Sequence, residues 1–305
     1  MDLCVWNRCN NHCTMCTNPE GFQAKEDSRD YSFQKIIQRI EAQVPFWKKI
    51  EENINITGGE PTIHSHFLDL CFWFRKKLPK NKIVVSSNGR MFHYEHFTKK
   101  FLKINNLVIG VAILGPNEKI HDSITRVKGS FKQTINGLNN ILKFKNITQE
   151  LELRIILIKQ NYKLLQETLS FILKNLSSVD RIVIIFPEPE GVCGDNYNTV
   201  GIKYSQVKKD IFSVIQWWKD RKELRLYHFP LCTLDPKLWK HTWITQRQEE
   251  ISFPEQCIKC PYKSYCCGVH KDYLEIIGDK EFQPPKTSLQ FEFSQNKHHP
   301  IINIV

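Results

Sequence analysis

Three cysteines near the start of the chain have a spacing that could hold a reactive metal centre. Cys9, Cys13 and Cys16 stand in the pattern C-x3-C-x2-C, directly after a short apolar stretch. Structural zinc and ordinary iron–sulfur clusters take four protein ligands. A [4Fe–4S] cluster held by three thiolates instead leaves one iron open, and an open iron can bind a cofactor or a substrate. The alternative is a zinc or ordinary cluster site that borrows a fourth ligand, such as His12.

A second pattern follows the next predicted strand, where the chain reads Gly58, Gly59, Glu60 and Pro61. Together with the cysteine spacing, this segment resembles the radical S-adenosylmethionine (SAM) enzymes, and the resemblance covers about residues 3–270. One departure from the family is Met15, which stands where an aromatic residue is usual. A thioether can also pack against adenine.

The resemblance implies which residues hold the cofactors and which chemistry follows. Cys9, Cys13 and Cys16 would bind the [4Fe–4S] cluster, and SAM would chelate its open iron. An electron from an external donor would cleave SAM to methionine and a 5′-deoxyadenosyl radical, which takes a hydrogen atom from the substrate. Glu60 would suit the SAM ammonium group, and Arg154 has a surface ion pair as its alternative role. The full set of implied cofactor contacts is Gly58, Gly59, Glu60, Pro61, Ser86, Asn88, Arg154, Asn161 and Phe186.

A second group of cysteines lies near the end of the chain. Three of them have the spacing C-x2-C-x5-C, which resembles the SPASM or "twitch" extension of radical SAM peptide maturases. His270 replaces the cysteine that usually follows there, so one auxiliary [4Fe–4S] cluster is expected rather than two. Cys267 is a rival fourth ligand, and zinc is the alternative metal. The predicted ligands are Cys232, Cys257, Cys260 and Cys266.

Three of the remaining cysteines have separate interpretations. Cys4 and Cys71 fall on a predicted strand and on an apolar helix face, so they are expected to pack in the core. Cys193 lies in a loop after the sixth predicted strand, where barrel enzymes carry their active sites. Its thiol could return a hydrogen atom to a substrate radical or bind a cluster iron. An ordinary loop thiol is the alternative.

Alternating strand and helix patterns must position these residues. Short segments rich in Ile and Val predict parallel strands at 3–6, 53–57, 82–86, 107–113, 151–158 and 181–186. Amphipathic segments between them predict helices, two of which begin at the capping residues Ser32 and Ser130. Six βα units predict the α/β fold class, as an open (βα)6 partial TIM barrel that matches the radical SAM core.

The domain organisation follows from where this pattern ends. A chain of 305 residues with 41% hydrophobic content can bury one large core and an appendage. The partial-barrel domain is predicted at 1–222. A small cysteine-rich domain with an auxiliary iron–sulfur cluster is predicted at 223–280. Residues 281–305 are predicted to form an extended tail that docks on the rest.

Composition limits the compartment and the partners. The chain has no apolar run of about 18 residues and no secretory signal pattern, so a cytoplasmic protein is expected. Thiols stay reduced there, and clustered cysteines then point to metal rather than to disulfides. The net charge of +11 indicates either a solvated basic surface or attraction to an acidic partner. No arginine-rich run supports nucleic acid specifically.

The finer resemblance concerns the substrate. His121 and Asp122, followed by residues 129–131, resemble a segment of peptide maturases, and the C-terminal cysteine pattern is most similar to maturases of His-Xaa-Ser peptides. We therefore expect an oxidoreductase that modifies a ribosomally made peptide by hydrogen abstraction. Leader recognition would fall to a partner or to the barrel, since no winged helix is found. The alternatives are a radical SAM enzyme acting on a nucleotide or RNA, and a two-cluster electron-transfer protein in which Glu60 has no role.

Overall fold

The computed structural model describes residues 2–19, 22, 28–218, 221–286 and 290–304. The chain divides into two compact units. The first comprises Met1–Cys13, Asn18–Arg154 and Ser170–Asp180, and the second comprises Thr14–Thr17, Ile155–Leu169 and Arg181–Val305. The division passes through the loop that carries Cys9, Cys13 and Cys16, called the cysteine loop below.

The first unit is built on parallel strands that follow chain order. They are β1 (Asp2–Trp6), β2 (Ile54–Gly58), β3 (Ile83–Ser87), β4 (Leu107–Ala112) and β5 (Gln149–Ile156), the last two residues of which belong to the second unit. Each strand pairs in parallel with the next. The apolar residues of β2 and β3 and most of those of β4 and β5 are buried, as expected for parallel strands covered on both faces, whereas only Val5 is buried in β1.

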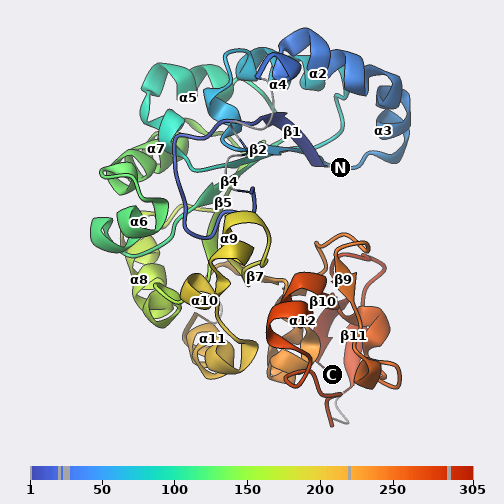
Figure 1. Ribbon diagram of the computed structural model, residues 1–305. Coiled ribbons are helices and arrows are strands. Elements are labelled where there is room, and N and C mark those ends of the chain that lie inside the picture. Colours follow the sequence, from blue (N-terminus) through green and yellow to red (C-terminus); the bar gives the residue numbers. More distant parts are fainter. Residues whose placement is uncertain (1, 20–21, 23–27, 219–220, 287–289, 305) are drawn as a thin grey trace. The chain divides into compact units, whose positions relative to one another are not determined.

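Amphipathic helices cover these strands, and Figure 1 shows α4, α5 and α7 along one side of them. The helices of this unit are α2 (Phe33–Ile40), α3 (Val44–Ile50), α4 (Phe67–Lys77), α5 (Glu95–Phe101), α6 (Glu118–Thr125) and α7 (Ser130–Phe144). The predicted cap of α2 is confirmed, because the Ser32 hydroxyl accepts a hydrogen bond from the N–H of Lys35 at 3.4 Å.

The predicted cap of α7 is wrong. The N-cap is Gly129, with φ +80°, and Ser130 is the first helical residue. The carboxylate of Asp122, in α6, accepts hydrogen bonds from the N–H of Gly129 at 2.5 Å and from the N–H of Phe131 at 2.8 Å. The Ser130 hydroxyl donates to the same carboxylate at 2.7 Å. An acidic side chain from the preceding helix thus accepts hydrogen bonds from backbone N–H groups at the start of α7, which have no partner within the helix.

The second unit continues with parallel strands in chain order. They are β6 (Arg181–Ile185), β7 (Glu223–Tyr227) and β8 (Thr242–Trp243), and each pairs in parallel with the next. The helices of this part are α9 (Gly191–Asp195), α10 (Tyr197–Val200), α11 (Tyr204–Trp218) and α12 (Lys271–Ile277), while α8 (Leu165–Asn175) is divided between the units. Parallel strand pairing therefore continues beyond residue 222, where the partial-barrel domain was predicted to end. Leu224 and Leu226 of β7 are buried, as are most residues of β6.

Two small antiparallel pairs complete the second unit. Strand β9 (Ile251–Ser252) pairs with β10 (Val269–His270), and β11 (Phe291–Phe293) pairs with β12 (Ile301–Ile304). The segment predicted to be an extended tail thus forms a hairpin. The ring of Phe291 stacks on Trp239 with centroids 4.8 Å apart, and His299 stacks on Trp243 at 4.6 Å. Aromatic stacking holds this hairpin to the unit.

The observed elements confirm the predicted α/β class. All six predicted strands are present as β1 to β6, displaced by no more than a few residues, and helices alternate with them. Within the described ranges, no helix combines the length and the apolar character needed to cross a membrane.

Candidate active site

The backbone after β2 packs directly on the start of the cysteine loop. The N–H of Gly59 donates to the carbonyl of Trp6 at 2.7 Å, and the N–H of Glu60 donates to the carbonyl of Arg8 at 2.8 Å. A Cβ atom at Gly58 would lie 2.3 Å from the Trp6 oxygen, and one at Gly59 would lie 2.4 Å from the Arg8 oxygen. Both glycines therefore allow two backbone segments to meet more closely than a side chain permits.

The carboxylate of Glu60 is only 1% exposed and is bonded to protein donors. One oxygen accepts from the N–H and hydroxyl of Thr62 and from the Ser87 hydroxyl at 2.8 Å, and the other accepts from the N–H of Asn88 at 2.6 Å. Burial raises the pKa of Glu60, against the effect of these hydrogen bonds. Pro61 begins the buried turn that follows. Glu60 thus joins the ends of β2 and β3, and its contact with a SAM ammonium group stays a prediction.

Residues that follow β3 bind the cysteine loop through side chains. The amide of Asn88 donates to the side-chain oxygen of Asn10 at 2.6 Å. Arg90 donates to the carbonyl of Asn10 and, at 2.7 Å, to the side-chain oxygen of Asn11. The N–H of Asn11 in turn donates to the sulfur of Cys9 at 3.3 Å. The loop is therefore held in shape by a network that includes one of the predicted cluster ligands.

The other two cysteines of the loop have different surroundings. Cys13 belongs to the first unit, in which the neighbouring His12 donates its N–H to the carbonyl of Thr125 at 2.9 Å. Cys16 belongs to the second unit, where its carbonyl accepts a hydrogen bond from the N–H of Cys193 at 2.9 Å. None of the eleven cysteines, all of which the structure describes, is in a disulfide.

Arg154 extends from β5 across β4 to β3. Its Nη1 donates to the Ser86 hydroxyl at 2.7 Å, and its Nε donates to Glu152 at 2.7 Å. A Cβ atom at Gly110 of β4 would lie 2.6 Å from the Arg154 Nε, so the glycine makes room for the guanidinium. The side chain of Glu152 is almost fully buried. Arg154 therefore forms an ion pair, as its alternative role predicts, although the pair is largely buried. The structure also brings Arg154 and Ser86 together, and contact of Arg154 with SAM stays a prediction.

Two predicted cofactor contacts in the second unit have structural roles. The side chain of Asn161 accepts from the N–H of Ile158 at 2.8 Å and donates to the carbonyl of Ile156 at 2.9 Å, which closes the turn after β5. The ring of Phe186 is buried and stacks on Tyr204 with centroids 3.6 Å apart. Contact of either residue with SAM stays a prediction.

Cys193 lies in the short helix α9, and its side chain is fully buried. Burial raises the pKa of its thiol to about 12, with a smaller contribution from nearby Glu188. The protonated thiol is therefore the stable form at neutral pH. Hydrogen-atom donation and cluster ligation by Cys193 both stay predictions.

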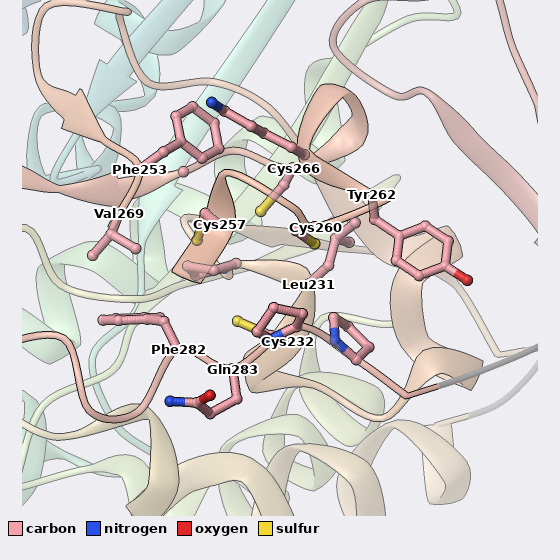
Figure 2. Close-up of a pocket in the computed structure, with 15 residues that line it drawn as sticks. Leu231, Cys232, Phe253, Cys257, Cys260, Tyr262, Cys266, Val269, Phe282 and Gln283 are labelled. Carbon is pink, nitrogen blue, oxygen red and sulfur yellow. The ribbon is translucent and has the colours of Figure 1, made fainter. Parts of the chain in front are cut away.

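Four cysteines of the second unit line one cavity, and Figure 2 shows their sulfur atoms around a shared space. They are Cys232, Cys257, Cys260 and Cys266. Burial raises the pKa of Cys232 to about 12. The rival ligand Cys267 is buried, and its thiol donates to the carbonyl of Gly268 at 3.3 Å. The structure thus brings together the four cysteines predicted as auxiliary ligands.

Two carboxylates after β6 were not predicted from the sequence. Glu188 lies 3.4 Å from Nδ1 of His228, and Glu190 lies 3.0 Å from Nε2 of His270. The other ring nitrogen of His270 accepts from the N–H of Asp272, so Nε2 carries the proton. Although Glu190, His270 and Asp272 place possible metal ligands within 4.8 Å of one another, both nitrogens of the histidine are already engaged. The two carboxylates could have been noticed in the sequence from the Glu-Pro-Glu segment that follows the sixth strand.

A comparison with protein families shows the superfamily to which this chain belongs. The family model of the radical SAM superfamily matches residues 3–172. The chain belongs to the radical SAM superfamily. The resemblance found in the sequence is thereby confirmed, and the family implies a [4Fe–4S] cluster and SAM as cofactors.

Two proteins of similar sequence have names that point to different substrates. GTP 3′,8-cyclase of Petrotoga mobilis is 28% identical over 139 residues, which cover 46% of this chain and 41% of that protein. Mycofactocin maturase MftC of Mycolicibacterium smegmatis is 29% identical over 136 residues, which cover 44% of this chain and 31% of that protein. The chain thus matches less than half the length of either relative.

Two solved structures have the same fold. SuiB of Streptococcus suis bound to S-adenosylmethionine superimposes with a TM-score of 0.63 at 13% identity, over 93% of this chain and 76% of that chain. SuiB bound to its precursor peptide SuiA superimposes with a TM-score of 0.58 at 15% identity, over 74% and 48% of the two chains. These likenesses confirm the predicted partial-barrel fold class.

The side chains of the first unit fit the cofactors of the radical SAM family. Cys9 is not in a disulfide, and its sulfur accepts a backbone N–H, the kind of hydrogen bond that surrounds cluster sulfurs. Arg154 and Ser86 offer a guanidinium and a hydroxyl, which suit the carboxylate of SAM. Arg90 and its partners Asn10 and Asn11 were not predicted from the sequence, although Arg90 stands only two residues after Asn88.

Proposed function

We propose that this radical SAM chain modifies a ribosomally synthesised peptide by hydrogen abstraction. The observation that carries the proposal is the cavity lined by Cys232, Cys257, Cys260 and Cys266. Four thiolates complete a site for a [4Fe–4S] cluster or for zinc. Because the spacing resembles the SPASM or twitch extension of peptide maturases, an auxiliary [4Fe–4S] cluster is part of the proposal.

The comparisons support a peptide as the substrate. One relative is named a mycofactocin maturase, and SuiB, whose fold this chain shares, has been solved with its precursor peptide bound. The expected partners are therefore a peptide substrate, a leader-recognition partner unless the barrel itself serves that purpose, and an external electron donor.

The chain's own residues bind and orient the cofactors. When bound, the first cluster and SAM supply a 5′-deoxyadenosyl radical that takes a hydrogen atom from the substrate. Cys9, Cys13 and Cys16 would hold the cluster, and Arg154 would hold the carboxylate of SAM. Glu60 keeps the loops after β2 and β3 joined, which maintains the backbone that faces the cysteine loop.

Cys193 is the proposed hydrogen-atom donor to the substrate. Its protonated thiol would give a hydrogen atom to a substrate radical and become a thiyl radical. The external donor would then supply one electron, and solvent would supply one proton, to restore the thiol. Cys193→Ala should preserve SAM cleavage while changing the product, and an unchanged product would exclude this role.

The decisive experiment couples SAM cleavage to a peptide product. Anaerobically reconstituted enzyme with dithionite should form 5′-deoxyadenosine together with a mass change in the cognate peptide. The double variant Cys257→Ala/Cys260→Ala should lose the mass change and retain uncoupled SAM cleavage. Cys71→Ala, at a packing position of α4, is the control that keeps both. Release of S-adenosylhomocysteine in place of deoxyadenosine would overturn the radical assignment.

A nucleotide is the second candidate substrate, because the Petrotoga relative is named a GTP 3′,8-cyclase. The same assay with GTP in place of peptide separates the two candidates. A mass change in GTP that depends on SAM and reductant would replace the peptide proposal. Unchanged GTP beside a modified peptide would exclude the second candidate.

A further inference from the structure

A single peptide group in the cysteine loop is hydrogen-bonded at both of its ends. Its carbonyl, from Asn10, accepts from Nη1 of Arg90. Its N–H, from Asn11, donates to the sulfur of Cys9 at 3.3 Å. A guanidinium and a predicted cluster ligand are therefore connected through one amide.

The guanidinium of Arg90 is fixed from several directions. Its Nε donates to the side-chain oxygen of Gln133, on α7, at 2.6 Å. Its Nη1 also donates to the side-chain oxygen of Asn11 at 2.7 Å, and the backbone N–H of Arg90 donates to Asn88 at 3.0 Å. Asn11 is itself buried. A planar donor with this many fixed acceptors has one orientation, which points its charge at the loop.

The connection has an electrostatic consequence. A cation at the carbonyl end polarises the amide, and hydrogen bonds in a chain strengthen one another, so the N–H at the other end becomes a better donor. Hydrogen bonds to cluster sulfurs are among the features that set the reduction potential of an iron–sulfur cluster. Reduction adds negative charge to the cluster and its ligands, so a stronger N–H donor favours the reduced state.

We propose that Arg90 is a positioning residue that holds the peptide between Asn10 and Asn11 against Cys9 and raises the reduction potential of the first cluster. The inference rests on the proposed function only in requiring a cluster on Cys9. It concerns residues that the cysteine and glycine motifs do not include.

The test measures the potential of the first cluster in the full-length holoenzyme. The electron paramagnetic resonance signal that changes on addition of SAM identifies this cluster, and its midpoint is followed in a redox titration. In Arg90→Gln, we expect the equilibrium constant for one-electron reduction to fall about tenfold, which corresponds to about 59 mV toward more negative potential. In Arg90→Lys, which keeps the charge but loses the planar fork, we expect a smaller decrease.

The matched control is Arg75→Gln. Arg75 is also bonded to several backbone carbonyls of the first unit, those of Leu78, Asn81 and Asn106, and not to the cysteine loop. Its substitution should lower stability and leave the potential unchanged. A purely structural role for Arg90 predicts the same result for both arginines.

The outcomes separate this inference from the proposed function. A wild-type protein without a SAM-responsive signal would overturn the proposed function. A wild-type signal with the same midpoint in Arg90→Gln would overturn the inference alone. If Arg90→Gln binds no iron, the midpoint of Arg90→Lys decides in the same way. Loss of iron from both Arg90 variants, with normal iron content in Arg75→Gln, would also overturn the inference. Arg90 would then be needed for cluster assembly, and not for setting the reduction potential of the cluster.

Discussion

Glu60 is the acceptor on which the ends of β2 and β3 converge. Its two carboxylate oxygens accept from Thr62, from the Ser87 hydroxyl and from the N–H of Asn88. A buried acceptor with this many donors is costly to change, because each donor that loses its partner is left without water. The charge and shape of this side chain therefore matter for the loops that face the cysteines.

Glu60→Gln should weaken both the fold and SAM binding. The amide NH2 of Gln replaces one acceptor oxygen, so at least one buried donor is left unpaired, at a cost of about 1–3 kcal/mol in unfolding free energy. Displacement of Asn88 should also raise the Kd for SAM. Urea unfolding and isothermal titration measure the two effects. Glu118→Gln, at an exposed position of α6, is the control. Equal stability of Glu60→Gln and wild type would contradict the role described above.

The three cysteines of the first loop should account for half of the iron. Reconstituted wild type should bind about eight irons and eight sulfides if it holds two [4Fe–4S] clusters. The triple change of Cys9, Cys13 and Cys16 to Ala should leave about four of each, because the cavity ligands of the second unit are untouched. Cys4→Ala should retain all eight. One zinc and four irons in the wild type would remove the auxiliary cluster from the proposal and spare the first.

At the scale of elements, α6 connects the cysteine loop with the start of α7. The carboxylate of Asp122 accepts hydrogen bonds from backbone N–H groups at the start of α7. The carbonyl of Thr125, the last residue of α6, accepts a hydrogen bond from the backbone N–H of His12. The segment whose sequence resembles peptide maturases thus has a positioning role here. His121 of the same helix is buried, and its Nδ1 accepts the N–H of Leu114 at 3.2 Å.

Protonation of His121 should destabilise the fold at acidic pH. Burial lowers the pKa of His121 to about 4 from an ordinary value of 6.5. The unfolded chain therefore binds the proton more tightly, and stability should fall as pH decreases from about 6.5 to 4, by up to about 3 kcal/mol. Urea unfolding across this range measures the slope. His121→Gln should flatten it, whereas His93→Gln, at an exposed position, should not. An unchanged slope in His121→Gln would contradict the assignment.

At the scale of the whole molecule, the net charge of +11 makes weak binding of polyanions inevitable at low salt. A functional RNA site and a merely basic surface differ in how they respond to salt. Electrostatic contacts are screened over about 8 Å at physiological ionic strength, whereas a shaped peptide groove depends more on hydrogen bonds and apolar contacts.

Generic RNA should therefore dissociate as salt rises. Fluorescence anisotropy with a labelled single-stranded RNA should show weak binding above about 150 mM salt, with a steep dependence of log K on log salt at lower concentrations. Binding of the cognate peptide should change much less over the same range. Tight RNA binding that persists at high salt would favour the nucleic-acid alternative over a peptide.

The sequence by itself determined the local features of this protein. The C-x3-C-x2-C loop, the glycines after β2 and the apolar strands β1 to β6 could all be predicted, because each depends on residues adjacent in the chain. The periodicity of a strand or the spacing of three thiols is a local property. Strand β7, Glu223–Tyr227, was missed because the strands were predicted from nearly continuous apolar runs, whereas β7 alternates polar and apolar residues, a pattern that also belongs to strands.

The tertiary structure decided which groups meet. Arg90 and Asn10 are 80 residues apart, and they are brought together because parallel strands end at the same edge of a sheet. Packing also places the Glu60 carboxylate next to protein donors. It places Asp122, instead of Ser130, where a side chain can accept from the first amides of α7. In the second unit it brings Cys232 to the same cavity as the later cysteines. A buried polar group bonds to whichever partner packing places within reach, and that choice has no local signature in the sequence.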